Sequence, residues 1–295
     1  MSNSKLKVAK GMETYLPNDY IDLVRKGQIK LAEEGNRPTV RNMGSFKELV
    51  EEHPMCAGCA MTLFIRQFYA TLPAPEDTIV LGTAGCARLS LSQAAVPFIY
   101  GNYGDTNAVA SGVKRTLDLR FPGKTKDVIC IAGDGGLADI GFSMTLHSWI
   151  RGEKFVTIMV DNETYGNTGG QESAMTMKGA EMKMSPGGKK FDKLDMPALA
   201  KVSGCAYVAI VNPYYPRKVE QAVEKAIILA RTVGPTYIQA DTSCNIEYAI
   251  PPEKVLEDAI NVEKERYGQE EYMTPAAEEY WAEYAAAKKA KKGAA

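Results

Sequence analysis

The sequence predicts an α/β fold in which a doubly wound, mostly parallel sheet carries helices on both faces. Two observations lead to this prediction. From about residue 78 to residue 240, short runs rich in β-branched residues alternate with segments of helical periodicity. The runs are apolar almost throughout, rather than at alternate positions, which is typical of strands buried on both faces of a parallel sheet.

Five apolar runs are predicted to be the strands of this sheet. Gly82 follows the first run and Gly133 follows the second, and glycine favours a turn after a strand. The runs continue as far as the segment before Asp241, after which the chain becomes polar. The expected strands cover residues 78–81, 127–132, 155–160, 206–211 and 236–240.

Four segments between the runs are predicted to be helices. The last is the clearest, because its apolar residues recur at the spacing of one helical face. Gly152 stands directly after the second segment, at the position where glycine commonly ends a helix. The expected helices cover residues 108–119, 138–151, 197–202 and 216–233.

The chain is predicted to have three parts. Residues 1–49 are polar, and we expect an N-terminal arm with one amphipathic helix over residues 19–34. Residues 50–255 hold the strand signals and are expected to form the α/β domain. Residues 256–295 are charged and end in an alanine- and lysine-rich stretch, so we expect a C-terminal helical tail.

The composition excludes several classes of function. The 295 residues are 45% hydrophobic and 24% charged, with a formal net charge of -1, which favours neither nucleic acid nor an anionic membrane. No apolar run approaches the roughly 20 residues of a membrane span, and the N-terminus does not resemble a secretory signal. We therefore expect a cytoplasmic protein, in which six cysteines do not indicate a disulfide framework.

A glycine-rich turn with one acidic residue separates a predicted strand from a predicted helix, where residues 133–136 read Gly-Asp-Gly-Gly. Glycines at such a turn let backbone N–H groups approach a phosphate, and a helix N-terminus favours its negative charge. Asp134, Asn162 after the next strand and the carbonyl of Thr164 offer oxygen ligands to Mg²⁺. An ordinary turn is the alternative, but the pairing with Asn162 favours a thiamine-diphosphate motif.

Two segments around this motif resemble the β subunits of pyruvate:ferredoxin oxidoreductases, which are 2-oxoacid:ferredoxin oxidoreductases. Residues 133–141, Gly-Asp-Gly-Gly-Leu-Ala-Asp-Ile-Gly, are similar to the family's cofactor turn. Residues 161–171, Asp-Asn-Glu-Thr-Tyr-Gly-Asn-Thr-Gly-Gly-Gln, are similar to its second cofactor segment. The end of that segment, residues 167–171, distinguishes this family from decarboxylases and transketolases.

Two further segments extend the resemblance from about residue 50 to residue 250. Residues 107–112 resemble a segment near the thiazolium ring, and residues 237–240 with Cys244 resemble the end of the family's fold. The resemblance implies that Asp134, Asn162 and the Thr164 carbonyl hold Mg²⁺. It implies that Asn167 faces the reacting end of the cofactor as the catalytic residue. The other residues implied to bind the cofactor are Gly133, Gly135, Gly136, Ile140, Thr168, Cys86 and Asn107.

The resemblance also implies a [4Fe–4S] cluster, because the family's β subunits carry one close to the thiamine. Four thiolates suit such a cluster. Cys130 and Cys205 lie in or beside apolar strands and are assigned to the core. On spacing alone, the Cys-x-x-Cys pair could instead bind zinc or act as a redox pair. The implied cluster ligands are Cys56, Cys59, Cys86 and Cys244.

The implied function is that of the β subunit of a 2-oxoacid:ferredoxin oxidoreductase. Such an enzyme decarboxylates a 2-oxoacid oxidatively, passes single electrons through the cluster to ferredoxin or a similar acceptor, and transfers the acyl group to coenzyme A. The implied partners are α and γ/δ-type subunits, one of which is expected to supply the carboxylate that activates the cofactor. The alternatives are a non-redox thiamine lyase with zinc at the cysteines and a subunit that has lost catalysis.

The sequence departs from the family pattern at places that leave the substrate open. Cys59 is followed by Ala-Met, where many relatives have Gly-Glu. The loop over residues 172–190 is rich in methionine, and we expect most of these side chains to pack in the core. Pyruvate, branched or aromatic 2-oxoacids and oxalate all remain candidate substrates.

Overall fold

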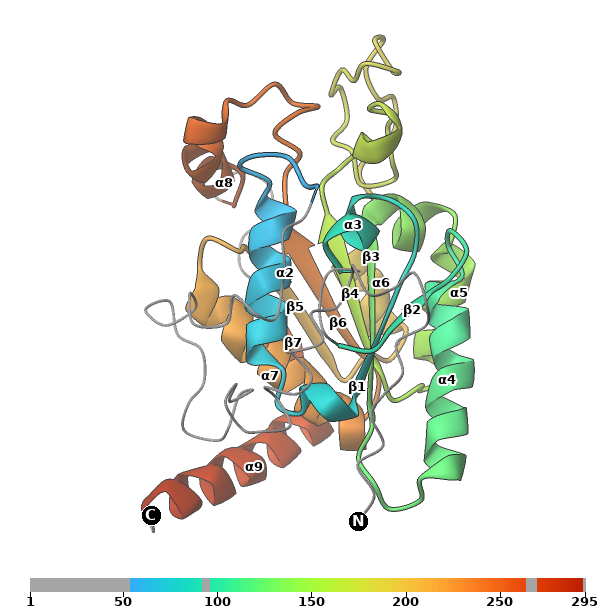
Figure 1. Cartoon of the computed structure of the whole chain (residues 1–295), viewed down its shortest axis with the longest axis vertical. Helices are drawn as coiled ribbons and strands as arrows, with labels where there is room; N and C mark the ends of the chain where they lie inside the picture. Colours follow the sequence, from blue (N-terminus) through green and yellow to red (C-terminus); the bar gives the residue numbers. More distant parts are fainter. Residues whose placement is uncertain (1–53, 92–95, 264–269, 294–295) are drawn as a thin grey trace, which may run out of the picture.

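The structure is a computed structural model that describes residues 54–91, 96–263 and 270–293. Its strands are β1 (Thr78–Gly82), β2 (Phe98–Tyr100), β3 (Asp127–Gly133), β4 (Val156–Asp161), β5 (Tyr207–Val211), β6 (Thr236–Asp241) and β7 (Glu271–Met273). They form one sheet in the order β2-β1-β3-β4-β6-β5-β7 (Figure 1). Neighbouring strands are parallel except β7, which runs antiparallel to β5. The predicted α/β fold with a mostly parallel sheet is confirmed.

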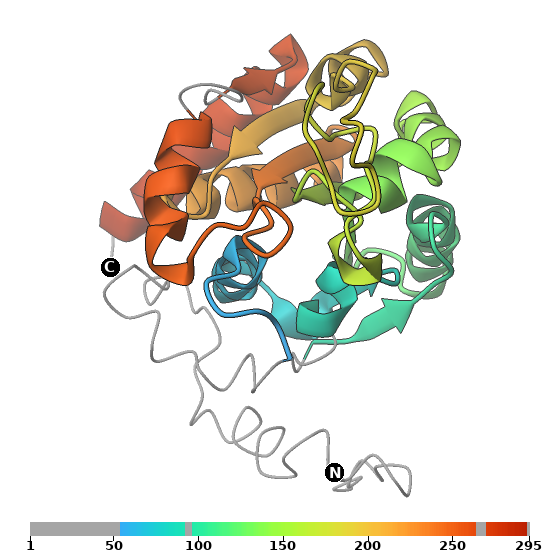
Figure 2. The same cartoon turned by 90° about the horizontal axis from the view of Figure 1, so that it is seen from above.

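Helices cover both faces of this sheet, as the view from above in Figure 2 shows. The helices of the described residues are α2 (Ala60–Thr71), α3 (Cys86–Leu91), α4 (Thr106–Arg120), α5 (Phe142–Ile150), α6 (Met196–Val202), α7 (Pro216–Thr232), α8 (Val255–Val262) and α9 (Pro275–Gly293). Helices α2 and α7 pack against each other on one face, whereas α4, α5 and α6 cover the other.

Strand β3 shows why the predicted strands are apolar throughout. Ile129 and Ile131 face the core cluster that includes α2 and α7, whereas Val128 and Cys130 face α4. This division follows from the period of two along a strand. Because burying an aliphatic side chain stabilises the fold by about 1.5–3 kcal/mol, a strand between two helical layers gains stability from every position.

Helix α7 is fixed at both ends. Pro216 occupies its first turn, where the missing N–H of proline removes no helical hydrogen bond. Near its C-terminus, Arg231 donates to both carboxylate oxygens of Asp127, at 2.8 and 2.6 Å, at the start of β3. The carboxylate outweighs burial and raises the pKa of Arg231. The ion pair therefore joins α7 to the amino edge of the sheet.

The predicted helix over residues 138–151 is wrong in its first turn. Gly135–Asp139 forms a π-helical turn, and α5 begins only at Phe142. Gly141 stands between the two segments, where glycine is required because a Cβ would collide with the main chain of Gly136 and Gly104. A wide turn of this kind is common at functional sites.

Four elements of the structure, α2, α3, β2 and β7, were not predicted. The segment over residues 256–295 is not helical throughout, since it also contributes β7 to the sheet. The predicted arm over residues 1–49, with its helix over residues 19–34, lies outside the described residues. Within the described part of the chain, none of the helices is both long and apolar enough to cross a membrane.

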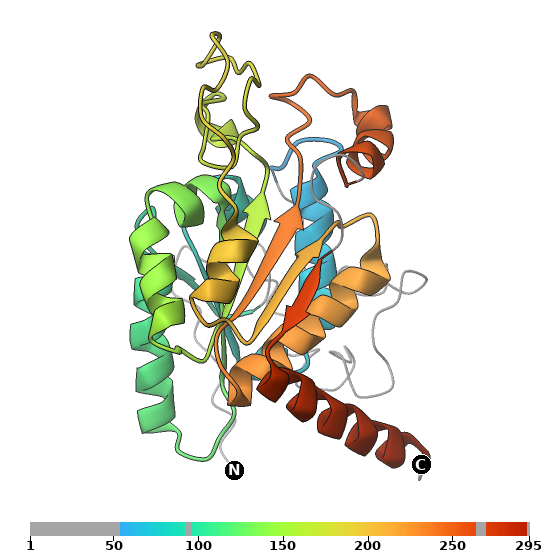
Figure 3. The same ribbon diagram turned by 180° about the vertical axis from the view of Figure 1, so that it is seen from behind.

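The carboxyl ends of β1, β3, β4 and β6 meet at one edge of the sheet. The long segment between β4 and α6 leaves the sheet at this edge and rises above it, as Figures 1 and 3 show. Open α/β sheets bind ligands outside the carboxyl ends of their strands. This edge is therefore where the predicted cofactor residues should meet.

Candidate cofactor and metal site

A cavity of about 270 Å³ opens at the carboxyl edge of the sheet. Its wall is formed by residues at or just after the ends of β1, β2, β3 and β4, together with Met61 at the start of α2. Ile140, which is 61% exposed, also lines it. The predicted site residues that line this cavity are Cys86, Gly133, Asp134, Ile140, Asn162, Thr164, Asn167 and Thr168.

Three oxygen atoms converge in the wall of this cavity. Oδ1 of Asn162 lies 2.9 Å from Oδ1 of Asp134 and 2.7 Å from the carbonyl oxygen of Thr164. Turning the amide would exchange this oxygen for nitrogen and convert both contacts into hydrogen bonds. In the metal-free chain the amide nitrogen would donate to both oxygens, whereas the amide oxygen in the same place would give Mg²⁺ three oxygen ligands. The predicted ligands thus fit a magnesium ion by their chemistry and by their convergence.

Asp134 is buried and is held from the loop above it. The hydroxyl of Ser173 donates a hydrogen bond to Oδ2 of Asp134. Burial and the charge of Asp161 raise the pKa of Asp134 well above its ordinary value, although the Ser173 hydrogen bond and the charge of Lys193 lower it. A divalent cation beside this carboxylate would favour its charged form, so the electrostatics also suit a metal site.

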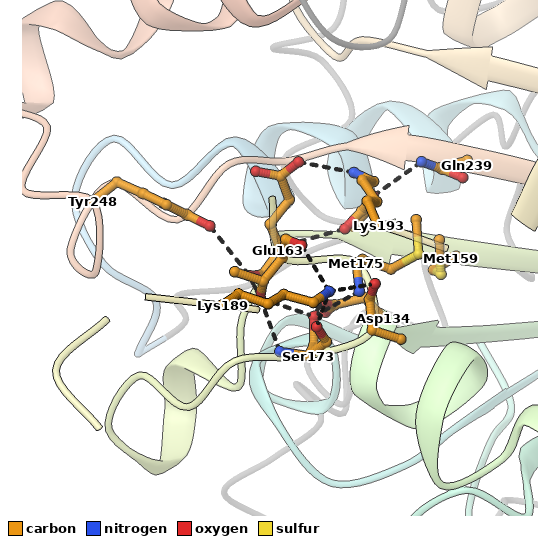
Figure 4. Close-up of polar contacts among 12 residues, drawn as sticks. Asp134, Met159, Glu163, Ser173, Met175, Lys189, Lys193, Gln239 and Tyr248 are labelled. Carbon is orange, nitrogen blue, oxygen red and sulfur yellow. Dashed lines mark hydrogen bonds and ion pairs between the residues drawn. The ribbon is translucent and has the colours of Figure 1, made fainter. Parts of the chain in front are cut away.

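A buried ion-pair network lies next to Asp134 (Figure 4). Lys193 donates to Oδ2 of Asp161 at 3.0 Å and to Oε1 of Glu163 at 2.8 Å. Gln239 of β6 donates to the same Asp161 oxygen at 2.9 Å. Burial alone would lower the pKa of Lys193, but the two carboxylates outweigh burial and raise it. The network joins the ends of β4 and β6 beside the three converging oxygens.

The main chain turns sharply between Asn162 and Thr164. Glu163 has a φ of 59°, in the left-handed region that non-glycine residues seldom adopt. Its carbonyl accepts hydrogen bonds from the hydroxyls of Thr176 and Tyr248, the latter at 3.2 Å. This held turn brings the Asn162 amide and the Thr164 carbonyl to the same point, and such strain is common at functional sites.

The four cysteines predicted to bind the cluster are neighbours at this end of the molecule. Burial and the thiols of Cys244, Cys59 and Cys56 raise the pKa of Cys86 to about 12. Within the described ranges, no three cysteine, histidine, aspartate or glutamate side chains are as close together as the ligands of one metal ion. The thiols therefore gather without forming a closed centre. Cys130 and Cys205 are fully buried in the core, as expected.

Three of the residues predicted to bind the organic cofactor do not line the cavity. The Asn107 amide donates to the hydroxyls of Ser148 at 2.9 Å and Thr157 at 3.0 Å, so it joins α4, α5 and β4 instead of facing the cofactor site. Gly135 and Gly136 are buried in the π-helical turn behind the cavity wall. Their contribution is to shape the turn that carries Asp134.

Two tyrosines of the cavity were missed by the sequence analysis. Tyr165 donates to Oδ2 of Asp139 at 2.9 Å, and its ring centroid lies 6.1 Å from that of Tyr103. Both side chains line the cavity. Tyr165 could have been found by its place directly after Asn162 and Thr164, whereas Tyr103 lies in a loop with no separate signal.

Replacing Gly135 by alanine is expected to weaken thiamine diphosphate binding by about 5- to 150-fold, because overpacking of this kind typically costs 1–3 kcal/mol. The new Cβ would collide with the Tyr165 ring and lie 2.8 Å from the Tyr103 hydroxyl. Gly112→Ala is the control, because nothing lies within 4 Å of that position in α4. The control should bind normally and unfold at a higher temperature. Cofactor titration and thermal unfolding check both variants, and normal binding by Gly135→Ala would contradict the packing of Tyr165.

The fold and the site define a thiamine-diphosphate-binding domain. Residues 83–240 match the family model described as "Thiamine pyrophosphate enzyme, C-terminal TPP binding domain". A solved structure of 2-oxoglutarate:ferredoxin oxidoreductase from Magnetococcus marinus has the same fold, with a TM-score of 0.59 and 20% sequence identity over 67% of each chain.

Curated relatives narrow this class. The chain is 34% identical to the pyruvate synthase subunit PorB of Methanothermobacter marburgensis, over 71% of this chain and 74% of the relative. It is 32% identical to the ketoisovalerate oxidoreductase subunit VorB of Pyrococcus horikoshii, over 70% of each. The chain belongs to the family of 2-oxoacid:ferredoxin oxidoreductase β subunits, as the sequence predicts. It is a subunit of an oxidoreductase that works with partner subunits.

Proposed function

We propose that this β subunit holds thiamine diphosphate through Mg²⁺ bound to Asp134, Asn162 and the carbonyl of Thr164, and that it serves the oxidative decarboxylation of a 2-oxoacid. The convergence of these three oxygens in the cavity wall is the observation that supports the proposal. The bound cofactor would supply an electron sink for the loss of CO₂. The chain itself would hold the metal and the diphosphate at the carboxyl edge of its sheet.

The remaining cavity residues support roles in binding and orientation. Gly133 lets the main chain approach the diphosphate, and Ile140 supplies apolar wall. Asn167 and Thr168 are both exposed where they line the cavity, which supports contact with the reacting end of the cofactor or with substrate. Asn167 is the proposed catalytic residue, and residues 50–255 are the proposed cofactor domain.

We further propose that Cys56, Cys59, Cys86 and Cys244 hold a [4Fe–4S] cluster. The cluster would accept single electrons. The placement of these cysteines supports the assignment: the Cys59 N–H donates to the Cys56 carbonyl at 3.2 Å, and Asn245, the neighbour of Cys244, donates to the Ala57 carbonyl between them at 2.9 Å. Cys86 also lines the cofactor cavity, so one side chain would lie between the cofactor and the cluster.

The proposed substrate is a 2-oxoacid of the kind that the relatives use. Their names include pyruvate synthase and ketoisovalerate oxidoreductase, and the chain is also 28% identical to the 2-oxoglutarate synthase subunit KorB of Archaeoglobus fulgidus. Partner subunits of the α and γ/δ types, a ferredoxin-like acceptor and coenzyme A complete the proposal. The chain's own contribution to the choice of acid would come from Met61, Tyr103 and Ile140 in the cavity wall.

Anaerobic purification with the partner subunits tests the proposal. We expect broad absorbance near roughly 400 nm, typical of thiolate-ligated clusters, that bleaches with one member of a 2-oxoacid panel when thiamine diphosphate and Mg²⁺ are present. Replacing Cys86 by serine should remove about four iron atoms per β subunit relative to the unaltered enzyme.

Cys130→Ala is the matched control for the cysteine variant. Cys130 lies within β3 and is fully buried, so its replacement should leave the iron content unchanged. Equal iron in the Cys86→Ser variant and the unaltered enzyme would assign the clusters to the other subunits. A colourless preparation with about one zinc per chain that still binds thiamine diphosphate would favour a non-redox thiamine lyase.

A further inference from the structure

A buried lysine closes the loop above the cofactor site. Lys189 is only 5% exposed, and its ammonium donates to the carbonyls of Ser173 and Ala174, both at 2.8 Å, and of Thr176 at 2.7 Å. These contacts use all three ammonium protons. The Lys189 main chain is held as well, because its N–H donates to Ala180 at 3.1 Å.

The segment that this ammonium holds is the segment that contacts Asp134. The Ser173 hydroxyl donates to Oδ2 of Asp134 and also accepts from the Met175 N–H at 3.1 Å. Residues 173–176 belong to no helix or strand. Their shape therefore depends on such local contacts, among which the three from Lys189 carry a full charge and are correspondingly strong. Figure 4 shows Lys189, Ser173 and Asp134 side by side.

The charge of Lys189 has no role in packing. Burial lowers the pKa of Lys189, because the charged form loses its hydration, although the charges of Asp139, Glu172 and Asp134 favour the ammonium. A neutral side chain of the same length would fill the same space without this penalty. The Lys189 ammonium draws three carbonyl groups to one point. This point lies near the Asp134 carboxylate, which faces the cavity.

We propose that Lys189 is a positioning residue for the magnesium–diphosphate site. Its ammonium fixes residues 173–176 so that the Ser173 hydroxyl orients the Asp134 carboxylate toward the metal. The inference rests on the proposed role of Asp134 as a magnesium ligand. Its chain of contacts runs from Lys189 through Ser173 to Asp134, so each link can be removed separately.

The first test compares Lys189→Met with Lys190→Met in the assembled enzyme, freed of cofactor. Lys190 is the matched control, because it is the neighbouring lysine but is exposed, and within the described residues its ammonium donates one hydrogen bond, to the Gly187 carbonyl. Thiamine diphosphate binding is titrated over a range of Mg²⁺ concentrations. Lys189→Met should need at least about tenfold more Mg²⁺, because losing an outer-shell contact of a metal ligand typically weakens metal binding by about 10–100-fold. Its kcat at saturating Mg²⁺ should stay within about threefold of the value for the unaltered enzyme. Lys190→Met should match the unaltered enzyme.

The second test uses Ser173→Ala, alone and combined with Lys189→Met. If Lys189 acts through Ser173, the two losses of Mg²⁺ affinity will not add in the double variant. Additive losses, or an unchanged Mg²⁺ requirement in Ser173→Ala, would overturn the proposal even if Lys189→Met fails to assemble. An unaltered enzyme that binds the cofactor without Mg²⁺ would instead reject the magnesium site itself. Mg²⁺-dependent binding that is the same in Lys189→Met rejects only the role of Lys189.

Discussion

Replacing Asp134 by alanine is expected to abolish turnover and to weaken Mg²⁺-dependent binding of thiamine diphosphate by at least about 100-fold. This loss lies at or beyond the upper end of the 10–100-fold typical for residues that only support a metal ligand, because Asp134 supplies the one carboxylate among the three converging oxygens. The Asn162 amide and the Thr164 carbonyl are uncharged metal ligands, so they cannot replace the charge of Asp134. Titration of the cofactor at several Mg²⁺ concentrations, together with turnover of a 2-oxoacid, measures the effect.

Asp192→Ala is the control for this substitution. Asp192 lies in the long loop between β4 and α6, and its side chain is 84% exposed and pairs with Lys178 at the surface. We expect normal binding and turnover in this variant. Asp134→Asn should lie between the two, because it keeps an oxygen and loses the charge. A normal Mg²⁺ requirement in Asp134→Ala would show that the three oxygens are not the metal site.

Replacing Lys193 by methionine is expected to lower the free energy of unfolding by about 3–5 kcal/mol, the usual effect of removing one partner from a buried ion pair. Two carboxylates depend on this ammonium, and the side chains of Asp161 and Glu163 are 0% and 1% exposed. The ends of β4 and β6 would therefore separate from the loop that carries Lys193. Denaturant unfolding at pH 7 measures the loss.

The pH dependence of the same interaction has a definite sign. The folded state raises the pKa of Lys193 above its ordinary value of 10.5, so the stabilisation is complete below about pH 10.5 and is lost as the pH rises through the folded value.

Lys178→Met is the control for Lys193→Met, because it removes an exposed ion pair and should change stability by no more than about 1 kcal/mol. Equal stability of the two variants would mean that the buried carboxylates find other compensation.

The sheet was predictable where a strand is buried on both faces, because burial leaves a continuous apolar run such as that of β3. The strands β2 and β7 were not predictable, since three residues each are too few to form a pattern. Helix α2 is buried on most of its surface, with Phe64, Ile65 and Phe68 fully enclosed, so it lacks the polar stripe that marks a surface helix.

The convergence of Asp134 and Asn162 was predictable because each directly follows a strand, Asp134 after β3 and Asn162 after β4. The residues that orient them were not, because Ser173 and Lys189 lie in an irregular loop whose folding back depends on individual hydrogen bonds. The prediction that most methionines of this loop pack in the core holds only in part. Met175 and Met182 are buried, whereas Met184 is 63% exposed.

The short edge strands have a consequence for assembly. Both β2 and β7 have three residues, so each edge of the sheet offers few main-chain groups to which another chain could add a strand. On β7, Glu271 accepts hydrogen bonds from Tyr207 and Lys225, both at 2.7 Å, which places charge at that edge. We therefore expect association through side-chain surfaces rather than by extension of the sheet, and resistance to amyloid-like stacking in the free subunit.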